Sequence, residues 1–253
     1  MRLSRRHPRY ASLLVRARLA DASRRGLVVP EGLIAQGRGE AFDYLLGERS
    51  TPSARRAART AARWLLAARR PVVSVNGNVA ALASAEVAAL QRAVPGLAVE
   101  VNLFHRTPAR ARAVARELRR AGVRGVLGVR PTARILHLPS DRALVDARGI
   151  ARADVCLVPL EDGDRAEALR RAGKRVIAID LNPLSRTARA ADVPIVDELG
   201  RALRNITAAA RARRVPVRAG ELPPFDAWRA LAEALEAIDR RLSAVGPPHR
   251  RRG

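Results

Sequence analysis

The stretch Pro71-Val72-Val73-Ser74-Val75-Asn76-Gly77-Asn78 decides the fold. Its first five residues are a short, largely β-branched run that is typical of a buried strand. The polar turn that follows leads into a helical pattern at about Val79–Ala93, with apolar residues three and four positions apart. A strand, a polar turn and a helix in this order form the repeating unit of an α/β domain with a parallel sheet.

The same unit recurs on both sides of this stretch. The predicted strands are Pro71–Val75, Leu97–Asn102, Val123–Val129, Asp154–Val158, Arg175–Ile179 and Val193–Val196. The predicted helices between them are Ser53–Arg69, Val79–Ala93, Pro108–Ala121, Asp164–Ala172 and Glu198–Arg213. We therefore expect a Rossmann-like α/β fold with a largely parallel sheet, helices on both faces and an additional C-terminal helix.

The two ends of the chain carry less regular patterns. At the front, Pro8–Arg25 is predicted as a helix that ends at Gly26, and Val29–Arg38 is predicted as a loop. At the back, Arg214–Pro224 is expected to be a linker to an amphipathic helix at Phe225–Leu242. We expect residues 1–245 to form a single domain and residues 246–253 to be a disordered basic tail.

Composition bounds the class of protein. With 253 residues and 48% apolar residues, the chain can bury a core, so disorder is excluded as its main state. The single cysteine, Cys156, excludes a disulfide scaffold and a multi-cysteine zinc site. No apolar run is long enough to span a bilayer or to act as a signal peptide, so we expect a cytoplasmic protein with no membrane partner.

The formal net charge of +24 by itself suggests nucleic acid as a partner. However, Lys174 is the only lysine, and the arginines are scattered through amphipathic helices without the aromatic residues that stack bases. This pattern is typical of a bias spread over the whole surface. Nucleic-acid binding is therefore disfavoured as the main role, while attraction of small polyanions is expected.

Four junctions after predicted strands are unusually polar. They are Asn76–Asn78, Asn102–Thr107, Pro159–Arg165 and Asp180–Thr187. Because ligands of doubly wound sheets bind beyond the carboxyl ends of the strands, we expect these segments to converge on one cleft.

Each junction admits a functional and a structural interpretation. Asn76-Gly77-Asn78 can present backbone N–H groups to phosphate, with Gly77 in a positive-φ turn, or can be a tight turn with an Asn cap. The carboxylates of Glu161, Asp162 and Asp164 suit Mg²⁺ or a ligand amine, but also suit a solvated loop that caps a helix.

Asp180 ends a strand and can accept hydrogen bonds from ribose, while Arg186 can neutralise phosphate. A capped turn explains the same residues. In Gly37-Arg38-Gly39-Glu40 the two glycines would let the backbone approach an anion that Arg38 grips. Neither a complete Rossmann fingerprint nor a Walker motif is present, so arginines and backbone amides would have to hold any nucleotide phosphates.

Taken in order, several blocks resemble the archaeal phosphopantothenate synthetase family, the 4-phosphopantoate–β-alanine ligases. The blocks are His7–Tyr10, Gly32–Glu48, Ser74–Asn78, Glu100–Phe104, Val158–Arg165 and Val176–Thr187. The resemblance implies a homodimer that joins 4-phosphopantoate to β-alanine with ATP, releasing AMP and pyrophosphate, in coenzyme A biosynthesis. Gln36 and His105 depart from the family's usual residues beside presumed ligand contacts.

The resemblance also implies roles for particular residues. The implied ATP contacts are Arg16, Arg38, Asp180, Leu181, Asn182, Arg186, Thr187, Glu198 and Leu199. As hypotheses beside it, Asn76, Asn78 and Arg106 hold phosphopantoate, and one of Glu161, Asp162 and Asp164 orients Mg²⁺ or the β-alanine ammonium group. The alternatives are a non-catalytic nucleotide sensor, since fold alone does not make an enzyme, and a basic nucleic-acid-binding protein.

Overall fold

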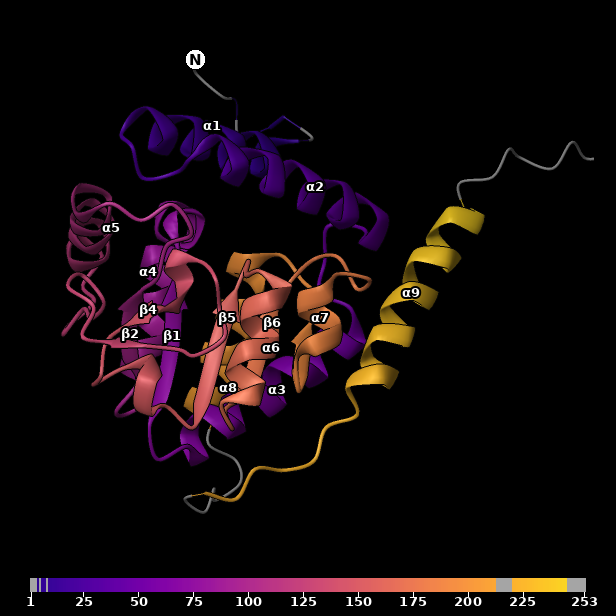
Figure 1. Cartoon of the computed structure of the whole chain (residues 1–253). Coiled ribbons are helices and arrows are strands. Elements are labelled where there is room, and N and C mark those ends of the chain that lie inside the picture. Colours follow the sequence, from indigo (N-terminus) through magenta and orange to yellow (C-terminus); the bar gives the residue numbers. More distant parts are fainter. Residues whose placement is uncertain (1–3, 5, 8, 213–219, 245–253) are drawn as a thin grey trace, which may run out of the picture.

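A parallel five-stranded sheet forms the centre of the molecule in the computed structural model, which describes residues 4, 6, 7, 9–212 and 220–244 (Figure 1). Its order is β2-β1-β5-β6-β7, and every neighbouring pair is parallel. The strands are β1 (Pro71–Val75), β2 (Ala98–Val101), β5 (Val155–Pro159), β6 (Arg175–Ile179) and β7 (Val193–Ile195). The predicted α/β fold with a largely parallel sheet is confirmed. Strand order reverses between β1 and β5, and such switch points commonly hold ligands.

Successive side chains of a strand point to opposite faces of the sheet, and in these strands both sets are largely apolar. Helices therefore cover both faces of the sheet. The helices are α1 (Tyr10–Arg24), α2 (Pro30–Leu46), α3 (Pro52–Ala67), α4 (Gly77–Ala93), α5 (Pro108–Arg120), α6 (Gly163–Arg171), α7 (Arg186–Ala190), α8 (Leu199–Ala212) and α9 (Ala227–Ala244). One core joins α3, α4, α5 and α8 to strand residues such as Val73 and Leu157. A second core on the other face joins α6 and the segment 133–153 to Val72, Cys156 and Ala178.

The C-terminal helix α9 lies beside α2, α3 and α7 and closes a third, smaller cluster of apolar side chains (Figure 1). This cluster consists of Leu46, Leu181, Ala188, Val196, Leu231, Ala234 and Ile238. The predicted helix at Phe225–Leu242 is thus confirmed, with bounds shifted by two residues at each end. Through Leu181 and Ala188, α9 is packed directly against the loop that follows β6.

Two predicted elements are wrong. Val123–Val129 is not a strand, because only Leu127 forms a bridge, to Glu100. Gly125 and Gly128 both have positive φ, which breaks the extended backbone. Val29–Arg38 is not a loop but contributes the start of α2, with Pro30 at the first helical position and Val29 extended before it.

The short elements α7, β3 (Ala133–Arg134) and β4 (Leu144–Val145) have no counterpart among the predictions. The last residue of the helix predicted at Glu198–Arg213, part of the predicted linker (214–219) and all of the predicted tail (246–253) lie outside the described residues. No described helix combines the length and the apolar character that a membrane crossing requires.

The segment between β2 and β5 folds around one buried carboxyl group, that of Glu100 in β2. Its two oxygens accept hydrogen bonds from the backbone N–H groups of Asp146 (2.9 Å) and Ile150 (2.6 Å). A side chain at Gly149 would come within 2.0 Å of Glu100 Oε2, so only glycine fits there. Burial raises the pKa of Glu100 to about 7. A strand side chain thus organises a segment that has little regular structure of its own.

The raised pKa of Glu100 predicts a pH-dependent free energy of unfolding. Between its ordinary value of 4.5 and about 7, the folded protein binds the proton more tightly than the unfolded chain. The contribution of Glu100 therefore falls as pH rises through this interval. We expect the wild type to lose about 3 kcal/mol of stability relative to Glu100→Gln across it. Denaturant unfolding at a series of pH values measures this difference.

The matched control is Glu236→Gln, which removes the same charge from an exposed position of α9. Its difference from the wild type should stay constant over the same pH range. A constant difference for Glu100→Gln as well would contradict the prediction.

Candidate active site

The four polar junctions lie together at the carboxyl edge of the sheet. The Nδ2 atom of Asn76 donates to the carbonyl oxygens of Pro159 (3.2 Å) and Leu160 (2.8 Å), which joins the ends of β1 and β5. Leu160 has a positive φ of 50°, a rare conformation for leucine that turns its carbonyl to this amide. The hydroxyl of Thr187 donates to the carbonyl of Glu161 at 2.6 Å, which adds the β6 junction.

The side chains of the turn at Asn76–Asn78 form hydrogen bonds within the protein. Asn76 Oδ1 accepts from the N–H of Val79 and caps α4, while Asn78 Nδ2 donates to the carbonyl of Gly32 in α2. Gly77 does not have positive φ, so that expectation is wrong. Glycine is needed because a Cβ atom there would lie 2.1 Å from the carbonyl oxygen of Leu27. The connection between α1 and α2 therefore rests directly on the start of α4.

A buried ion cluster occupies the centre of this edge. Glu161, whose side chain is 1% exposed, pairs with Arg142 Nη1 at 3.0 Å and with Arg165 Nη1. Arg165 Nη1 also donates to the hydroxyl of Ser74 at 3.0 Å, and Arg142 Nη1 to the carbonyl of Asn102 at 3.1 Å. Two arginines thus share one buried carboxylate, and the half-exposed Asp162 adds a second carboxylate beside Arg142.

Sequence reasoning missed both Arg142 and Arg165 as parts of this cluster. Two signals were present in the sequence. Ser74 is a polar residue inside an otherwise apolar strand, and Arg165 follows Glu161 by four residues at the start of a predicted helix. Arg142 gave no comparable signal, because its place depends on the fold of the segment after β2.

Several buried polar atoms at this edge lack a hydrogen-bond partner. Among the described residues, these atoms are Asn102 Oδ1, Arg106 Nη1, Arg142 Nε, Arg165 Nε and Arg165 Nη2. Arg142 Nε lies 3.3 Å from Asp162 Oδ2, an ion contact without hydrogen-bond geometry. Asn102 Oδ1 is an acceptor and the four arginine nitrogens are donors. Buried polar groups in proteins are nearly always satisfied, so these spare donors indicate a place for acceptor groups of water or of an anionic ligand.

The three predicted carboxylates do not come together. Glu161 is fully engaged by arginines, and Asp164 is exposed and pairs with Arg186 at 2.6 Å. Asp162 is half-exposed, and partial burial raises its pKa while Arg142 opposes the shift. In the part of the chain that the structure describes, no group of three or more His, Cys, Asp or Glu side chains could hold a metal ion.

The loop Asp180–Ser185 is held by its own hydrogen bonds. The Asp180 carboxylate accepts from the N–H of Asn182 (3.0 Å) and from the hydroxyl of Ser185 (2.6 Å). Burial raises the pKa of Asp180, while these two hydrogen bonds and the charge of Arg38 oppose the shift. Arg38 belongs to the exposed face of α2, and a Cβ atom at neighbouring Gly39 would lie 3.5 Å from Cδ1 of Leu181. The segment of α2 that carries Arg38 and Gly39 therefore lies beside the loop of Asp180 and Leu181.

The other residues implied as ATP contacts have different surroundings. Arg16 pairs with Glu40 of α2 at 2.9 Å and so lies between α1 and α2. Glu198 caps the start of α8 by accepting from the N–H groups of Gly200 and Arg201, and Leu199 is buried. Thr187 is buried as well, so only the backbone and a restricted part of its side chain face the loop.

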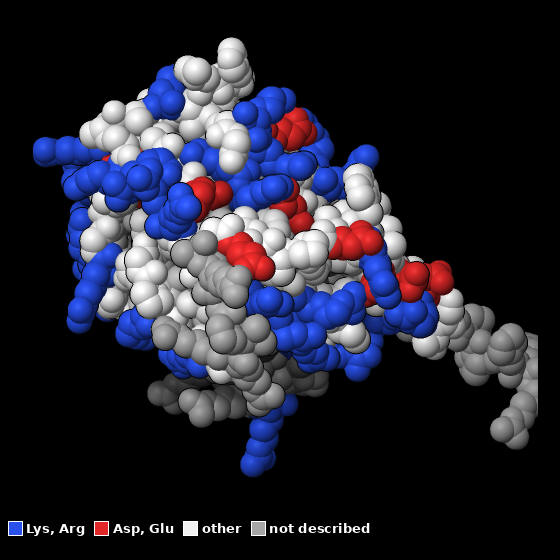
Figure 2. All heavy atoms as spheres, turned by 90° about the horizontal axis from the view of Figure 1, so that it is seen from below, with Lys and Arg blue, Asp and Glu red and all other residues white. Residues whose placement is uncertain are grey.

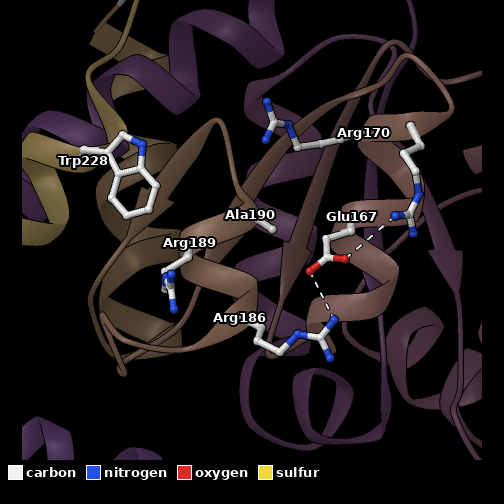
Figure 3. A pocket seen from close by; sticks show the side chains of 7 residues that line it. Glu167, Arg170, Arg186, Arg189, Ala190 and Trp228 are labelled. Carbon is white, nitrogen blue, oxygen red and sulfur yellow. Dashed lines mark hydrogen bonds and ion pairs between the residues drawn. The ribbon is translucent and has the colours of Figure 1, made fainter.

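The guanidinium group of Arg186 points away from these residues. It pairs with Asp164 and, at 3.2 Å, with Glu167, on the outer side of α6 and α7 (Figure 3). This orientation follows from packing, because a Cβ atom at Gly163 would lie 2.3 Å from Cβ of Arg186. The two helices therefore begin in contact, and the long side chain has to leave along the outer surface.

The buried ion cluster makes a testable prediction about stability. Glu161→Gln leaves Arg142 and Arg165 without their shared carboxylate, and an uncompensated buried charge costs about 3–5 kcal/mol. Adding Arg165→Met should recover part of this loss, because one of the two unpaired cations is then removed. Denaturant unfolding of both variants measures the two values, with Glu167→Gln on the exposed side of α6 as control. Additive losses in the double variant would contradict this account.

Comparison with known proteins gives a consistent result. Residues 53–241 match the family model described as phosphopantothenate/pantothenate synthetase. The chain is 50% identical over 243 residues to the 4-phosphopantoate–β-alanine ligase of Methanosarcina mazei, covering 94% of this chain and 95% of the relative. It is 49% identical to that of Thermococcus onnurineus over 250 residues (97% and 95%) and 56% identical to that of Methanospirillum hungatei over 200 residues (79% and 81%). The chain therefore belongs to the phosphopantothenate/pantothenate synthetase family.

Proposed function

We propose that this chain is a 4-phosphopantoate–β-alanine ligase that forms 4′-phosphopantothenate in coenzyme A biosynthesis. The observation that carries this proposal is the similarity, at about half of all positions, to relatives of that name over nearly the whole of both chains. The arginine-rich carboxyl edge is consistent with it, because the reaction brings two phosphorylated, negatively charged substrates together.

The proposed ATP site lies where α2 meets the loop after β6. Arg38 supplies a cation, and the carboxylate of Asp180 and the amide of Asn182 supply groups for ribose hydroxyls. Leu181, Thr187, Glu198 and Leu199 line the same side through backbone and apolar contacts. Arg16 contributes from the interface of α1 and α2, and Arg186 requires a different rotamer from the one described to reach the nucleotide.

The proposed phosphopantoate site lies next to it, over the ends of β1 and β2. The sequence suggests Asn76, Asn78 and Arg106 for this site, but all three hold backbone segments, Arg106 through the carbonyls of Gly128 and Val129. We therefore assign Asn76 and Asn78 to shaping the site and Arg106 to bracing the loop beside it.

Arg110 and Arg142 are better suited to bind the phosphate itself. Arg110 is anchored by hydrogen bonds from Nε to the carbonyl of Leu27 and from Nη1 to that of His105, and a Cβ atom at Gly77 would lie 2.9 Å from its Nη2. Burial, and then the nearby charge of Arg142, lower the pKa of Arg110. Two guanidinium groups near the start of a helix repel each other, and an anion bound between them removes this repulsion.

The proposed reaction has two steps. The carboxylate of 4-phosphopantoate attacks the α-phosphate of ATP, which forms an acyl-adenylate and releases pyrophosphate. The amine of β-alanine then attacks the acyl carbonyl, loses a proton and displaces AMP. Arginines and backbone N–H groups promote both steps by holding the reactants in line and by neutralising developing charge.

A metal ion would have to be bound mainly by the substrate. Of Glu161, Asp162 and Asp164, the half-exposed Asp162 is the carboxylate least engaged by arginines, so we propose that Mg²⁺ comes with the phosphates of ATP, as it commonly does. Mg²⁺ would supply additional charge neutralisation on the phosphates. The same Asp162 is the best candidate to receive the ammonium group of β-alanine, since Glu161 and Asp164 are already paired.

A homodimer is part of the proposal. Large apolar side chains are exposed on α2 and in loops that follow strands, among them Ile34, Phe104, Leu136 and Leu184. A second copy would cover such residues. Figure 2 shows arginines spread over much of the face seen from below, with a few small groups of carboxylates among them. We propose that nucleic acid is not the main partner, because the chain has few aromatic residues that could stack bases.

Release of products by the purified protein tests the proposed function. With ATP, Mg²⁺, 4-phosphopantoate and β-alanine we expect AMP, pyrophosphate and 4′-phosphopantothenate in equal amounts, measured by chromatography. Omission of β-alanine should abolish 4′-phosphopantothenate formation. ATP binding without any product would favour a nucleotide sensor instead, and absence of ATP binding would contradict both.

Arg38→Ala tests the proposed ATP site. Because Arg38 is exposed, we expect an unchanged melting temperature but an apparent KM for ATP raised about tenfold or more. The control is Arg59→Ala, an exposed arginine of α3. If both variants show the same kinetics as the wild type, Arg38 has no role in ATP binding.

A further inference from the structure

A second group of arginines surrounds an open hollow on the outer side of α6, α7 and α9 (Figure 3). Its volume is about 670 Å³, within the range typical of small-molecule sites. We call it the outer hollow, and it is lined by Glu167, Arg170, Arg171, Arg186, Arg189, Ala190 and Trp228. The family resemblance gave a role to Arg186 alone among these residues.

Most side chains that line the outer hollow are cationic, although Asp164 and Asp192 beside it pair with Arg186 and Arg170. Four of its seven residues are arginines, and its one acidic residue, Glu167, already pairs with Arg186 (3.2 Å) and Arg171 (3.9 Å). Arg170 lies 3.5 Å from Asp192, and Arg189 makes no ion pair within the described residues. Ion pairs between exposed side chains are weak, so a ligand with several negative charges can replace them.

Trp228 gives the hollow an aromatic wall. Its side chain is exposed at 65%, although tryptophan is usually largely buried. In Figure 3 the indole ring lies across the hollow from Glu167, with Arg189 and Ala190 between them. An exposed indole beside guanidinium groups is the combination that stacks a nucleobase and binds its phosphates.

The outer hollow is separated from the proposed ATP site by α7 itself. Thr187 and Ala188 face inward, where Thr187 binds the carbonyl of Glu161 and Ala188 packs with Leu181. Arg189 and Ala190 line the hollow on the outer side. A ligand in the hollow would therefore contact a different surface of the helix from the substrate nucleotide.

We propose that the outer hollow is a second nucleotide site, which binds a nucleoside di- or triphosphate with its base on Trp228 and its phosphates on Arg189 and Arg170. Trp228, Arg189 and Arg170 have no assigned part in the reaction, and only Arg186 lines the outer hollow and is also assigned to the ATP site. Its proposed ligand is a free nucleotide, because the arginines and the indole ring line one open hollow of about 670 Å³, the size of a small-molecule site.

Tryptophan fluorescence provides a direct test with ADP as the probe. Trp64 is 5% exposed and its Nε1 donates to the carbonyl of Pro223 at 2.8 Å, so a surface ligand should quench only Trp228. We expect saturable quenching by ADP at constant ionic strength, and much less by tripolyphosphate, which has no base. Arg189→Glu should weaken ADP binding about tenfold or more, because an attractive charge becomes repulsive. The same change at exposed Arg59 should leave binding unaltered.

Calorimetric titration separates the two sites. We expect two ADP molecules per wild-type chain and one in the combined variant Trp228→Ala, Arg189→Glu, with ligase turnover retained. The same number of ADP molecules per chain in the wild type and the combined variant, or equal quenching in Arg189→Glu and the wild type, would overturn the proposal. Quenching that a single-stranded oligonucleotide produces at lower concentration than ADP would also overturn it, in favour of nucleic acid. Loss of ligase activity alone would bear on the proposed function and not on this site.

Discussion

The carboxylate of Glu161, buried between two arginines, is the interaction on which the carboxyl edge of the sheet depends. A buried carboxylate is tolerated only when it is paired and hydrogen-bonded, and here the partners come from distant parts of the chain. Arg165 links it to β1 through Ser74, and Arg142 links it to the end of β2 through Asn102. One charge therefore fixes how β1, β2, β5, α6 and the segment before β4 meet, and these are the parts that surround the proposed reaction.

The same arrangement explains why this edge suits anions. Glu161 is the one buried carboxylate between two guanidinium groups, since Asp162 beside Arg142 is half-exposed, and burial raises the pKa of Glu100 to about 7. Arg106 and Arg110 bring further positive charge to the ends of β1 and β2 while their other nitrogens bind backbone carbonyls. The cations are thus held in place before any ligand arrives, which lowers the cost of ordering them on binding.

The sequence predicted the sheet correctly because its five strands are short apolar runs, most of them followed by polar turns and amphipathic helices. It failed where tertiary contacts override local preference. Gly32, Gly37 and Gly39 favour a loop, but α2 is helical and lies against Asn78 and Leu181. Leu127 sits in an apolar run, but the glycines around it turn the backbone. For the site, the polar junctions were predicted in the right place. The inward position of Arg142 and the outward direction of Arg186 depend on tertiary packing, which a local sequence pattern does not show.

The third apolar cluster bears on how the protein is made. Leu181 and Ala188 flank the loop after β6, yet their partners Leu231, Ala234 and Ile238 lie in the last described helix, roughly fifty residues further along the chain. During synthesis, the strands of the sheet leave the ribosome and can pair before α9 exists. The loop that carries Asp180 would then stay without its apolar cover until the end of translation. A chain truncated before α9 would have a complete sheet and still lack the apolar cover of the loop that carries Asp180.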